Sequence, residues 1–302
     1  MMRIRALGSL FALLTASCSS GGSGVGAAAT DPVPDYEDFS APALNPDRGE
    51  AIPRVRFKAT PEDNWQRAEK EFDRRNHLAA QQYYSFIRTK FPYSRYAVLS
   101  ELRIADCQYE RDHYLEAIDS YQNFVRLHPT HRQVPYAMFR TGVAHYEQIP
   151  GGFFLLPPAE EKDQTAVKQA SKALAAYLER FPDHERSDDA RKVYREVREK
   201  LMAHERYAAN FYRKLGRDRA YVGRLEIIRE DFSDVGLDPK LLLEIATVHA
   251  RLGNVDETRE AFEEMAEKYP DASELTRRTE LVTEAEGTAA VIEEAEKDRP
   301  FY

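Results

Sequence analysis

The chain repeats itself with a period of 37 residues, and no other feature constrains its fold as strongly. The segment KFPYS at 90–94 aligns with LHPTH at 127–131, so that the two prolines lie 37 positions apart. The other aligned pairs are Ala68 and Ala105, Phe72 and Tyr109, Leu78 and Leu115, Ala80 and Ala117, and Tyr84 and Tyr121. A fixed period of this kind indicates stacked units that bury their apolar faces against one another.

Each unit has the residue pattern of a helical hairpin. A small residue is followed four positions later by an aromatic one, then by a turn, then by alanine with a second aromatic residue, and proline closes the unit. Residues four apart share one helix face, so the small residue lets two helices touch and the ring fills the neighbouring groove. The pattern resembles the tetratricopeptide repeat. It predicts an all-α solenoid of about five helix pairs behind a disordered N-terminal tether.

The third unit contains an insertion. Gly142 and Tyr146 mark its first helix, but its closing Pro182 lies sixteen residues later than the period predicts. The extra residues, at about 151–166, include GGFFLLPPAEEKDQT, and so many apolar residues are unusual in a solvated turn. The insert either folds back on the solenoid, which is the favoured interpretation, or docks a partner.

The fourth unit begins with a long helix, from about Ser187 to Lys214, and leaves its register open. Arg224 stands where the other units place a large core residue. A guanidinium in the core needs an acidic partner, in this chain or in another. The alternative is a shift of one residue that points Leu225 inward. A fifth unit runs from about Leu237 to Pro270.

The N-terminus has the features of a bacterial secretion signal, with Arg3 and Arg5, a short apolar stretch and small residues before a cysteine. The stretch is too short to span a bilayer, which takes about 20 residues. The segment TASC at 15–18 resembles the cleavage box of lipoproteins, which implies acylation of Cys18 with palmitate-like chains. An ordinary cleaved signal with a free thiol is the alternative. Ser19 resembles the outer-membrane sorting pattern of lipoproteins.

These features divide the chain into segments. We predict a signal peptide at 1–17, a flexible Gly- and Pro-rich tether at 18–62, repeats one to three at 63–183, repeats four and five at 184–285, and an acidic tail at 286–302. The tether lacks periodicity, so it would let an anchored domain stand away from the membrane.

Composition and motifs exclude several functions. The chain has 43 basic residues, of which the signal removes two, against 51 acidic ones, and this balance disfavours nucleic-acid partners. Cys107 lies in a periodic apolar helix and is expected in the core. No nucleophile elbow, phosphate loop or paired-cysteine motif occurs, and His128 and His131 lack carboxylate support for a metal. We therefore expect no enzyme, no metal and no cofactor beyond acyl chains on Cys18.

Stacked helix pairs expose a concave surface that suits extended or helical peptides. The first helices of the repeats line it, which gives a candidate peptide groove of Trp65, Phe72, Leu102, Tyr109, Phe139 and Tyr146. An acidic border would consist of Glu69, Asp73, Asp106, Glu110 and Glu147. The alternative is that these aromatic residues pack within the solenoid. Trp65 and Phe139 are the members expected to be most exposed.

The chain after the tether resembles the BamD family, the lipoproteins of the outer-membrane β-barrel assembly machine. The resemblance is carried by the lipoprotein box, the tether, the five repeats, EKDQTA in the third unit and LMAHERYAANFYRKLGRDRAYVGRL at 201–225. It implies a periplasmic solenoid anchored to the outer membrane. Its C-terminal half would contact the POTRA domains of the barrel-forming subunit BamA, and its N-terminal groove would receive unfolded outer-membrane protein precursors.

On this reading the partner interface includes Arg224, Tyr207, Phe211, Tyr212 and Arg213, with the alternative that the three rings are core. The acidic tail and the long tether depart from the family pattern, which leaves contacts to other assembly lipoproteins open. A tethered repeat adaptor that coordinates cell-wall synthesis or envelope constriction is the alternative function.

Overall fold

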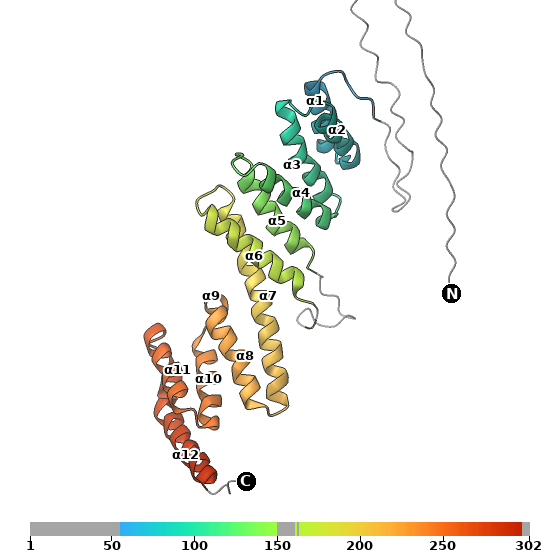
Figure 1. Ribbon diagram of the computed structural model, residues 1–302. Coiled ribbons are helices and arrows are strands. Elements are labelled where there is room, and N and C mark those ends of the chain that lie inside the picture. Colours follow the sequence, from blue (N-terminus) through green and yellow to red (C-terminus); the bar gives the residue numbers. More distant parts are fainter. Residues whose placement is uncertain (1–54, 150–160, 162, 298–302) are drawn as a thin grey trace, which may run out of the picture. The chain divides into compact units, whose positions relative to one another are not determined.

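The computed structural model describes residues 55–149, 161 and 163–297, and this part of the chain is helical without strands (Figure 1). The α-helices are α1 (Pro61–Asp73), α2 (His77–Lys90), α3 (Arg95–Tyr109), α4 (Tyr114–Leu127), α5 (Val134–Glu147), α6 (Thr165–Arg180), α7 (Ser187–Lys214), α8 (Asp218–Asp231), α9 (Ser233–Gly236), α10 (Pro239–Leu252), α11 (Val255–Lys268) and α12 (Arg278–Lys297). A 3-10 helix, η2 (Ser273–Arg277), precedes α12. The all-α prediction is confirmed.

The helices pair into five hairpins, which are α1 with α2, α3 with α4, α5 with α6, α7 with α8, and α10 with α11. Each hairpin packs against the next along the chain, and α12 packs against α10 and α11 (Figure 1). The five predicted helix pairs are therefore present. The predicted boundary at 285 falls inside α12, which continues to Lys297.

Local sequence sets the helix ends. Thr60 caps α1 by accepting a hydrogen bond from the backbone N–H of Asp63 at 3.1 Å, and Pro61 follows it at the first helical position. Asp238 caps α10 in the same way, 2.7 Å from the backbone nitrogen of Leu241. Gly253 ends α10 with a positive φ of 74°, a conformation that costs glycine least.

The repeat positions form the contacts between helices. Ala68, Ala105, Tyr84 and Tyr121 are fully buried. Gly142 occupies the position of the two alanines in the third unit, where a Cβ atom would lie only 2.7 Å from Cδ2 of Leu174. The small residues are thus needed because the facing helix leaves no room for a larger side chain.

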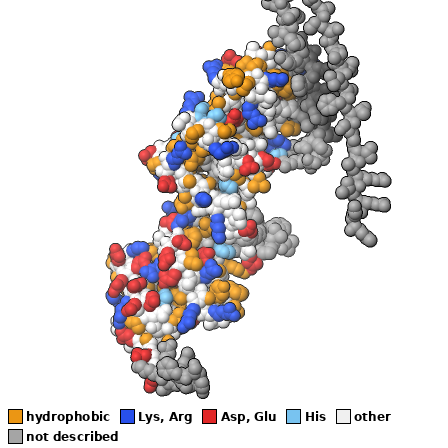
Figure 2. Space-filling view, in the orientation of Figure 1, with side chains coloured by type: hydrophobic (Ala, Val, Ile, Leu, Met, Phe, Trp, Pro, Cys, Tyr) orange, Lys and Arg blue, Asp and Glu red, His pale blue; other side chains and the backbone are white. Residues whose placement is uncertain are grey.

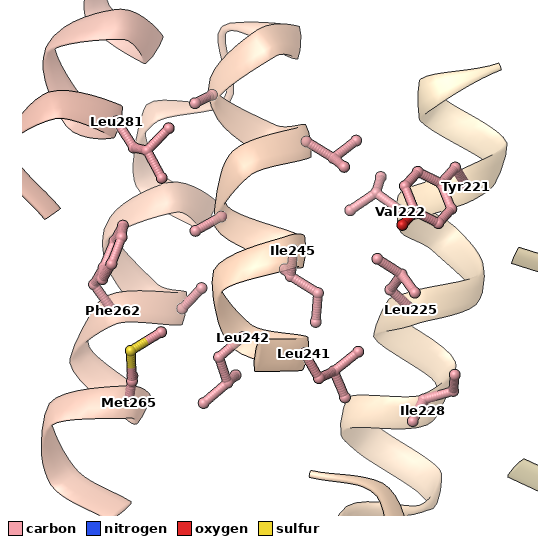
Figure 3. Close-up of a cluster of buried hydrophobic side chains, with 14 of the residues drawn as sticks. Tyr221, Val222, Leu225, Ile228, Leu241, Leu242, Ile245, Phe262, Met265 and Leu281 are labelled. Atoms are coloured by element: carbon pink, nitrogen blue, oxygen red, sulfur yellow. The ribbon is translucent and has the colours of Figure 1, made fainter. Parts of the chain in front are cut away.

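The register of the fourth unit is the shifted one. Leu225 is fully buried, seven residues before the closing Phe232, as Tyr84 stands seven residues before Phe91. Leu225 joins Tyr221, Ile228 and side chains of α10 in the largest apolar cluster (Figure 3). Of the two registers that the sequence left open, the structure has the one that points Leu225 inward, where an apolar side chain fills the core position and Arg224 does not.

Several predicted features lie outside the described residues. These are the signal peptide, Cys18, the tether up to residue 54, and the insert at 150–160 and 162. Cys107 is described and is fully buried, as predicted for a core residue. No helix in the described part of the chain is long and apolar enough to cross a membrane.

Candidate functional site

The six candidate groove residues lie on α1, α3 and α5, two on each helix, but they do not form one exposed floor. Leu102 and Phe139 are buried, at 4% and 8% exposure, so the expected exposure of Phe139 is wrong. Both belong to apolar clusters inside the hairpin stack, because α4 and α6 cover that side of their helices. For these two residues the alternative of packing within the solenoid holds.

The other four candidates are half-buried. The ring of Trp65 contacts Tyr84 at 5.3 Å and Tyr96 at 5.4 Å between centroids. Tyr146 donates a hydrogen bond to Glu196 of α7 at 2.6 Å. Each of these rings therefore has one face in the core and one edge toward solvent, an arrangement common at binding surfaces.

Two arginines, 37 residues apart, cover the remaining two rings. The guanidinium carbon of Arg103 lies 4.7 Å from the ring centre of Phe72, and that of Arg140 lies 3.7 Å from the ring centre of Tyr109. In each pair the arginine comes from the first helix of the next repeat, so the contact links neighbouring units. Their separation equals the repeat period, so the sequence already relates these two arginines. The candidate groove was chosen from apolar positions and did not include them.

The carboxylates expected to border the groove are largely neutralised. Glu69 is 2.5 Å from Nη2 of Arg103 and accepts a hydrogen bond from the hydroxyl of Tyr84 at 2.5 Å. Burial and this bond raise the pKa of Tyr84, which keeps the hydroxyl a donor. Glu110 pairs with Arg140 at 3.2 Å. The surface thus presents guanidinium groups and rings alongside its acids.

Asp106 is the clearest correction to the predicted border, because it is buried at 2% exposure. It accepts hydrogen bonds from the hydroxyls of Tyr121 at 2.7 Å and Tyr136 at 2.9 Å, and it pairs with Arg103 at 3.2 Å. A buried carboxylate of this kind is stable only when its lone pairs are satisfied. Asp106 therefore holds the groove arginine in position and does not meet a ligand.

An open depression of about 560 Å³ lies where α1, α2 and α3 meet. It is lined by Phe72, Asp73, Arg75, His77 and Glu110. The rings of Phe72 and His77 meet edge to face at 4.9 Å, and burial lowers the pKa of His77, so the imidazole is neutral at pH 7. The depression combines an aromatic wall with both signs of charge, which suits a peptide side chain.

A second candidate surface lies on α7. Tyr207, Phe211 and Leu215 are exposed at 39%, 54% and 52%, and their spacing of four residues places them in one row over about 12 Å of helix. We call this row the α7 stripe. Tyr207 donates a hydrogen bond to Glu161. Leu215 follows the α7 helix itself and was missed, although its spacing from Phe211 marks it.

The remaining predicted interface residues lie outside the α7 stripe. Tyr212 is half-buried and packs against the C-terminal core cluster, so of the three rings it is the one that contributes to the core. Arg224 pairs with Glu205 at 2.8 Å, and its side chain is 37% exposed. Arg213 lies 3.7 Å from Glu244 and is 57% exposed. At about 100° per residue Arg213 lies more than 100° around α7 from each member of the stripe, so its guanidinium is not part of the row.

Among the residues that the structure describes, no group of His, Cys, Asp and Glu could hold a metal ion.

Comparison with known proteins decides the family. The family model for YfiO, described as outer membrane lipoprotein, matches residues 58–265. The chain belongs to this family. The YfiO match begins at the first described turn before α1 and ends in α11, so it covers all five hairpins.

Curated relatives support the same assignment. The outer membrane protein assembly factor BamD of Caulobacter vibrioides is 27% identical over 187 residues, which are 62% of this chain and 59% of that protein. BamD of Neisseria meningitidis serogroup A is 24% identical over 211 residues, 69% of this chain and 79% of that protein. The predicted resemblance to the BamD family is confirmed. The match to the Caulobacter protein spans less than two thirds of its length.

A solved structure, the TPR2AB-domain:pHSP90-complex of yeast Sti1, covers 78% of this chain and 92% of that chain, with a TM-score of 0.38 and 14% identity. The helix pairs of this chain, with their 37-residue spacing, carry the repeat assignment by themselves.

Proposed function

We propose that this YfiO-family chain is a non-catalytic scaffold that takes part in the assembly of outer membrane proteins, on the periplasmic face of the outer membrane. Family membership and the names of the curated relatives, outer membrane protein assembly factors, support this role. Two separate surfaces, one in each half of the helix array, suit a protein that brings other polypeptides together.

The anchor in this proposal is Cys18, acylated after cleavage of the signal peptide. Each buried acyl CH₂ contributes about 0.8 kcal/mol, and two or more chains give stable attachment where one chain does not. Substitution Cys18→Ser removes the acylation site. We expect the variant protein to lose radiolabelled palmitate and to leave the membrane fraction, and retention of both would refute the anchor.

The α7 stripe would receive the barrel-forming subunit BamA through its POTRA domains. The observation that carries this assignment is the exposed row of Tyr207, Phe211 and Leu215. Exposed aromatic side chains are enriched among interface hot spots, where a few residues supply most of the affinity. Pairs such as Arg224 with Glu205 can exchange their carboxylate for one on the partner.

The N-terminal surface would receive unfolded precursors. Strands of barrel proteins alternate apolar and polar residues and are rich in aromatic residues. The half-buried rings of Trp65 and Phe72, with the depression beside them, offer apolar contact for such segments. Arg103 and Arg140 supply cation–π and hydrogen-bonding groups along the same helices.

A pull-down from cells with matched variants tests the role of the α7 stripe. Phe211→Ala with Leu215→Ala removes two exposed apolar side chains, and the control pair, Leu115→Ala with Val291→Ala, removes two of comparable exposure on α4 and α12. We expect the first pair to lower recovery of the barrel-forming subunit at least about tenfold and to reduce folded porins, because loss of hot-spot side chains costs about 1 kcal/mol or more each. The control pair should change neither.

Equal recovery with both variants would refute the assignment of the surface. Recovery of a cell-wall synthase as the main partner, with normal porin levels after depletion of the chain, would refute the proposed function itself.

A further inference from the structure

Two turns of the N-terminal half concentrate positive charge. Residues 88–96 and 126–133 contain five arginines and lysines and no carboxylate, in a chain whose net charge is −8. All five are exposed, namely Arg88, Lys90, Arg95, Arg126 and Arg132. The contrast with the C-terminal helices is visible in Figure 2, where carboxylates gather over α11 and α12. We call the two turns together the basic edge.

The two turns lie on the same edge of neighbouring hairpins. One joins α2 to α3 and the other joins α4 to α5, and α3 and α4 pack against each other. A contact of 2.8 Å between Nε2 of His128 and Oε2 of Glu101 holds the second turn against the N-terminal part of α3. Packed helices are about 8–10 Å apart, so the two turns, which are two helix spacings apart, lie within about 20 Å of each other.

Exposed apolar side chains accompany the cations. Tyr93 at the tip of the first turn is fully exposed, and Leu127 at the start of the second is 57% exposed. Aromatic and aliphatic side chains among arginine and lysine are the composition of surfaces that rest in the headgroup region of a membrane. An acidic protein partner could use the same side chains, but the position of the tether on this edge favours the membrane.

The chain also enters the described structure on the basic edge. The hydroxyl of Tyr83 in α2 donates a hydrogen bond to the carbonyl of Arg56 at 3.2 Å, and Phe57 stacks on Phe86 at 4.1 Å. The tether therefore attaches beside the end of α2. Arg56 and Lys58 are exposed there and offset the nearby acids of the first turn of α1.

The length of the tether limits the distance between the helix array and the membrane. A Gly-rich linker with as many residues as lie between Cys18 and residue 55 has a root-mean-square span of roughly 35 Å. Because the tether attaches on the basic edge, it keeps the cations of this edge within reach of the bilayer. Such tethering turns a weak surface contact into an intramolecular one with a high effective concentration.

We propose that the basic edge binds the anionic phospholipid headgroups of the membrane to which the chain is anchored. The proposal rests on the proposed function only for the anchor at Cys18. Each arginine or lysine near an anionic surface contributes about fivefold in affinity, and salt weakens the contact. The edge would orient the helix array so that α1, α3 and α5 stand at a fixed angle to the bilayer.

Vesicle binding by the full mature chain with Cys18→Ser, which has no acyl group, tests the edge without the anchor. The vesicles are phosphatidylglycerol mixed one to two with phosphatidylcholine, or phosphatidylcholine alone. We expect sedimentation with the first at low salt, none with the second, and loss at high salt. Absence of binding to the anionic vesicles would overturn the proposal.

Matched variants locate the contact. Arg88→Gln, Arg126→Gln and Arg132→Gln together should lower the partition coefficient about a hundredfold. Three exposed lysines on α6 and α7, at positions 168, 172 and 200, changed to glutamine, alter the net charge equally and should have little effect. Equal binding by the two triple variants would overturn the proposal.

If the triple variant unfolds, a dye attached at a single cysteine still tests where the chain contacts the vesicles. With Cys18 replaced and Cys107 buried, Tyr93→Cys provides one reactive thiol on the basic edge, and Leu115→Cys provides one at the other end of α4. An environment-sensitive dye at 93 should shift to the blue on anionic vesicles, and the dye at 115 should not. The opposite result would place the contact elsewhere.

Two further outcomes would also refute membrane binding by the basic edge. Vesicle binding that requires removal of residues 19–54 would show that the acidic tether occupies the edge. Displacement of the vesicles by an acidic peptide at matched charge, with no effect of Tyr93→Ala, would show a protein partner. Retained recovery of the barrel-forming subunit in either case would leave the proposed function standing.

Discussion

The contact between α5 and α6 at Gly142 gives a prediction whose size follows from the structure. A Cβ atom at position 142 would lie 2.7 Å from Cδ2 and 2.8 Å from Cγ of Leu174, which is fully buried and would have to shift within the core. Overpacking of this kind costs about 1–3 kcal/mol. Alanine also recovers about 1 kcal/mol of helix propensity. We therefore expect Gly142→Ala to lower the free energy of unfolding by about 1 kcal/mol.

Gly223 provides the matched control. It lies inside α8 and is exposed, and a Cβ atom added there would have no neighbouring atom within 4 Å. Gly223→Ala should raise the free energy of unfolding by about 0.5–1 kcal/mol, because only the propensity gain operates there. Urea unfolding followed by far-ultraviolet circular dichroism measures both variants under one set of conditions.

A double-mutant cycle identifies the clash as the cause. Leu174→Ala alone should cost about 2–5 kcal/mol, and in the Gly142→Ala background it should cost less, because the new methyl group fills part of the cavity. The reasoning is refuted if Gly142→Ala stabilises the protein as much as Gly223→Ala, or if the two α5–α6 substitutions are additive.

Three further predictions concern other parts of the array. Leu225→Ala should cost about 2–5 kcal/mol and Arg224→Ala no more than about 1 kcal/mol, measured by urea unfolding, since the first is core and the second a partly exposed ion pair. Asp106→Ala should cost about 3–5 kcal/mol and leave Arg103 misplaced, so that peptide binding at the N-terminal surface falls as well; unchanged melting would contradict the network. Burial lowers the pKa of His145, so the unfolded chain takes up the proton first and stability should fall as pH drops below about 6.5; thermal melts of His145→Leu should show a smaller slope, and an identical slope would exclude this residue.

The period of the sequence predicted the hairpins because close helix contact demands a small residue and a ring at fixed spacing. The limits of α7, Ser187 to Lys214, followed from the length of its amphipathic pattern. The register of the fourth unit can be found by counting residues back from the aromatic residue that closes each unit. In the first unit the core ring lies seven residues before that position. Counting back from Phe232 reaches Leu225, the residue that the structure buries.

The site was harder to predict than the fold. Leu102 and Phe139 occupy the face of a first helix that meets its own hairpin partner, and spacing along a helix does not separate that face from the neighbouring groove face. The choice of partner for each charged group depends on the distance between repeats, which the sequence does not contain. Asp106 was therefore assigned to a solvated border, although two tyrosine hydroxyls and Arg103 enclose it.

Crosslinking in intact cells tests the central claim that this helix array holds other polypeptides during outer-membrane assembly. A photoreactive amino acid at position 211 samples the α7 stripe, and one at position 72 samples the depression between α1 and α3. The account predicts an adduct with the barrel-forming subunit from position 211 and adducts with unfolded outer-membrane precursors from position 72. A cell-wall synthase as the main adduct from 211, with no precursor captured from 72, would contradict it.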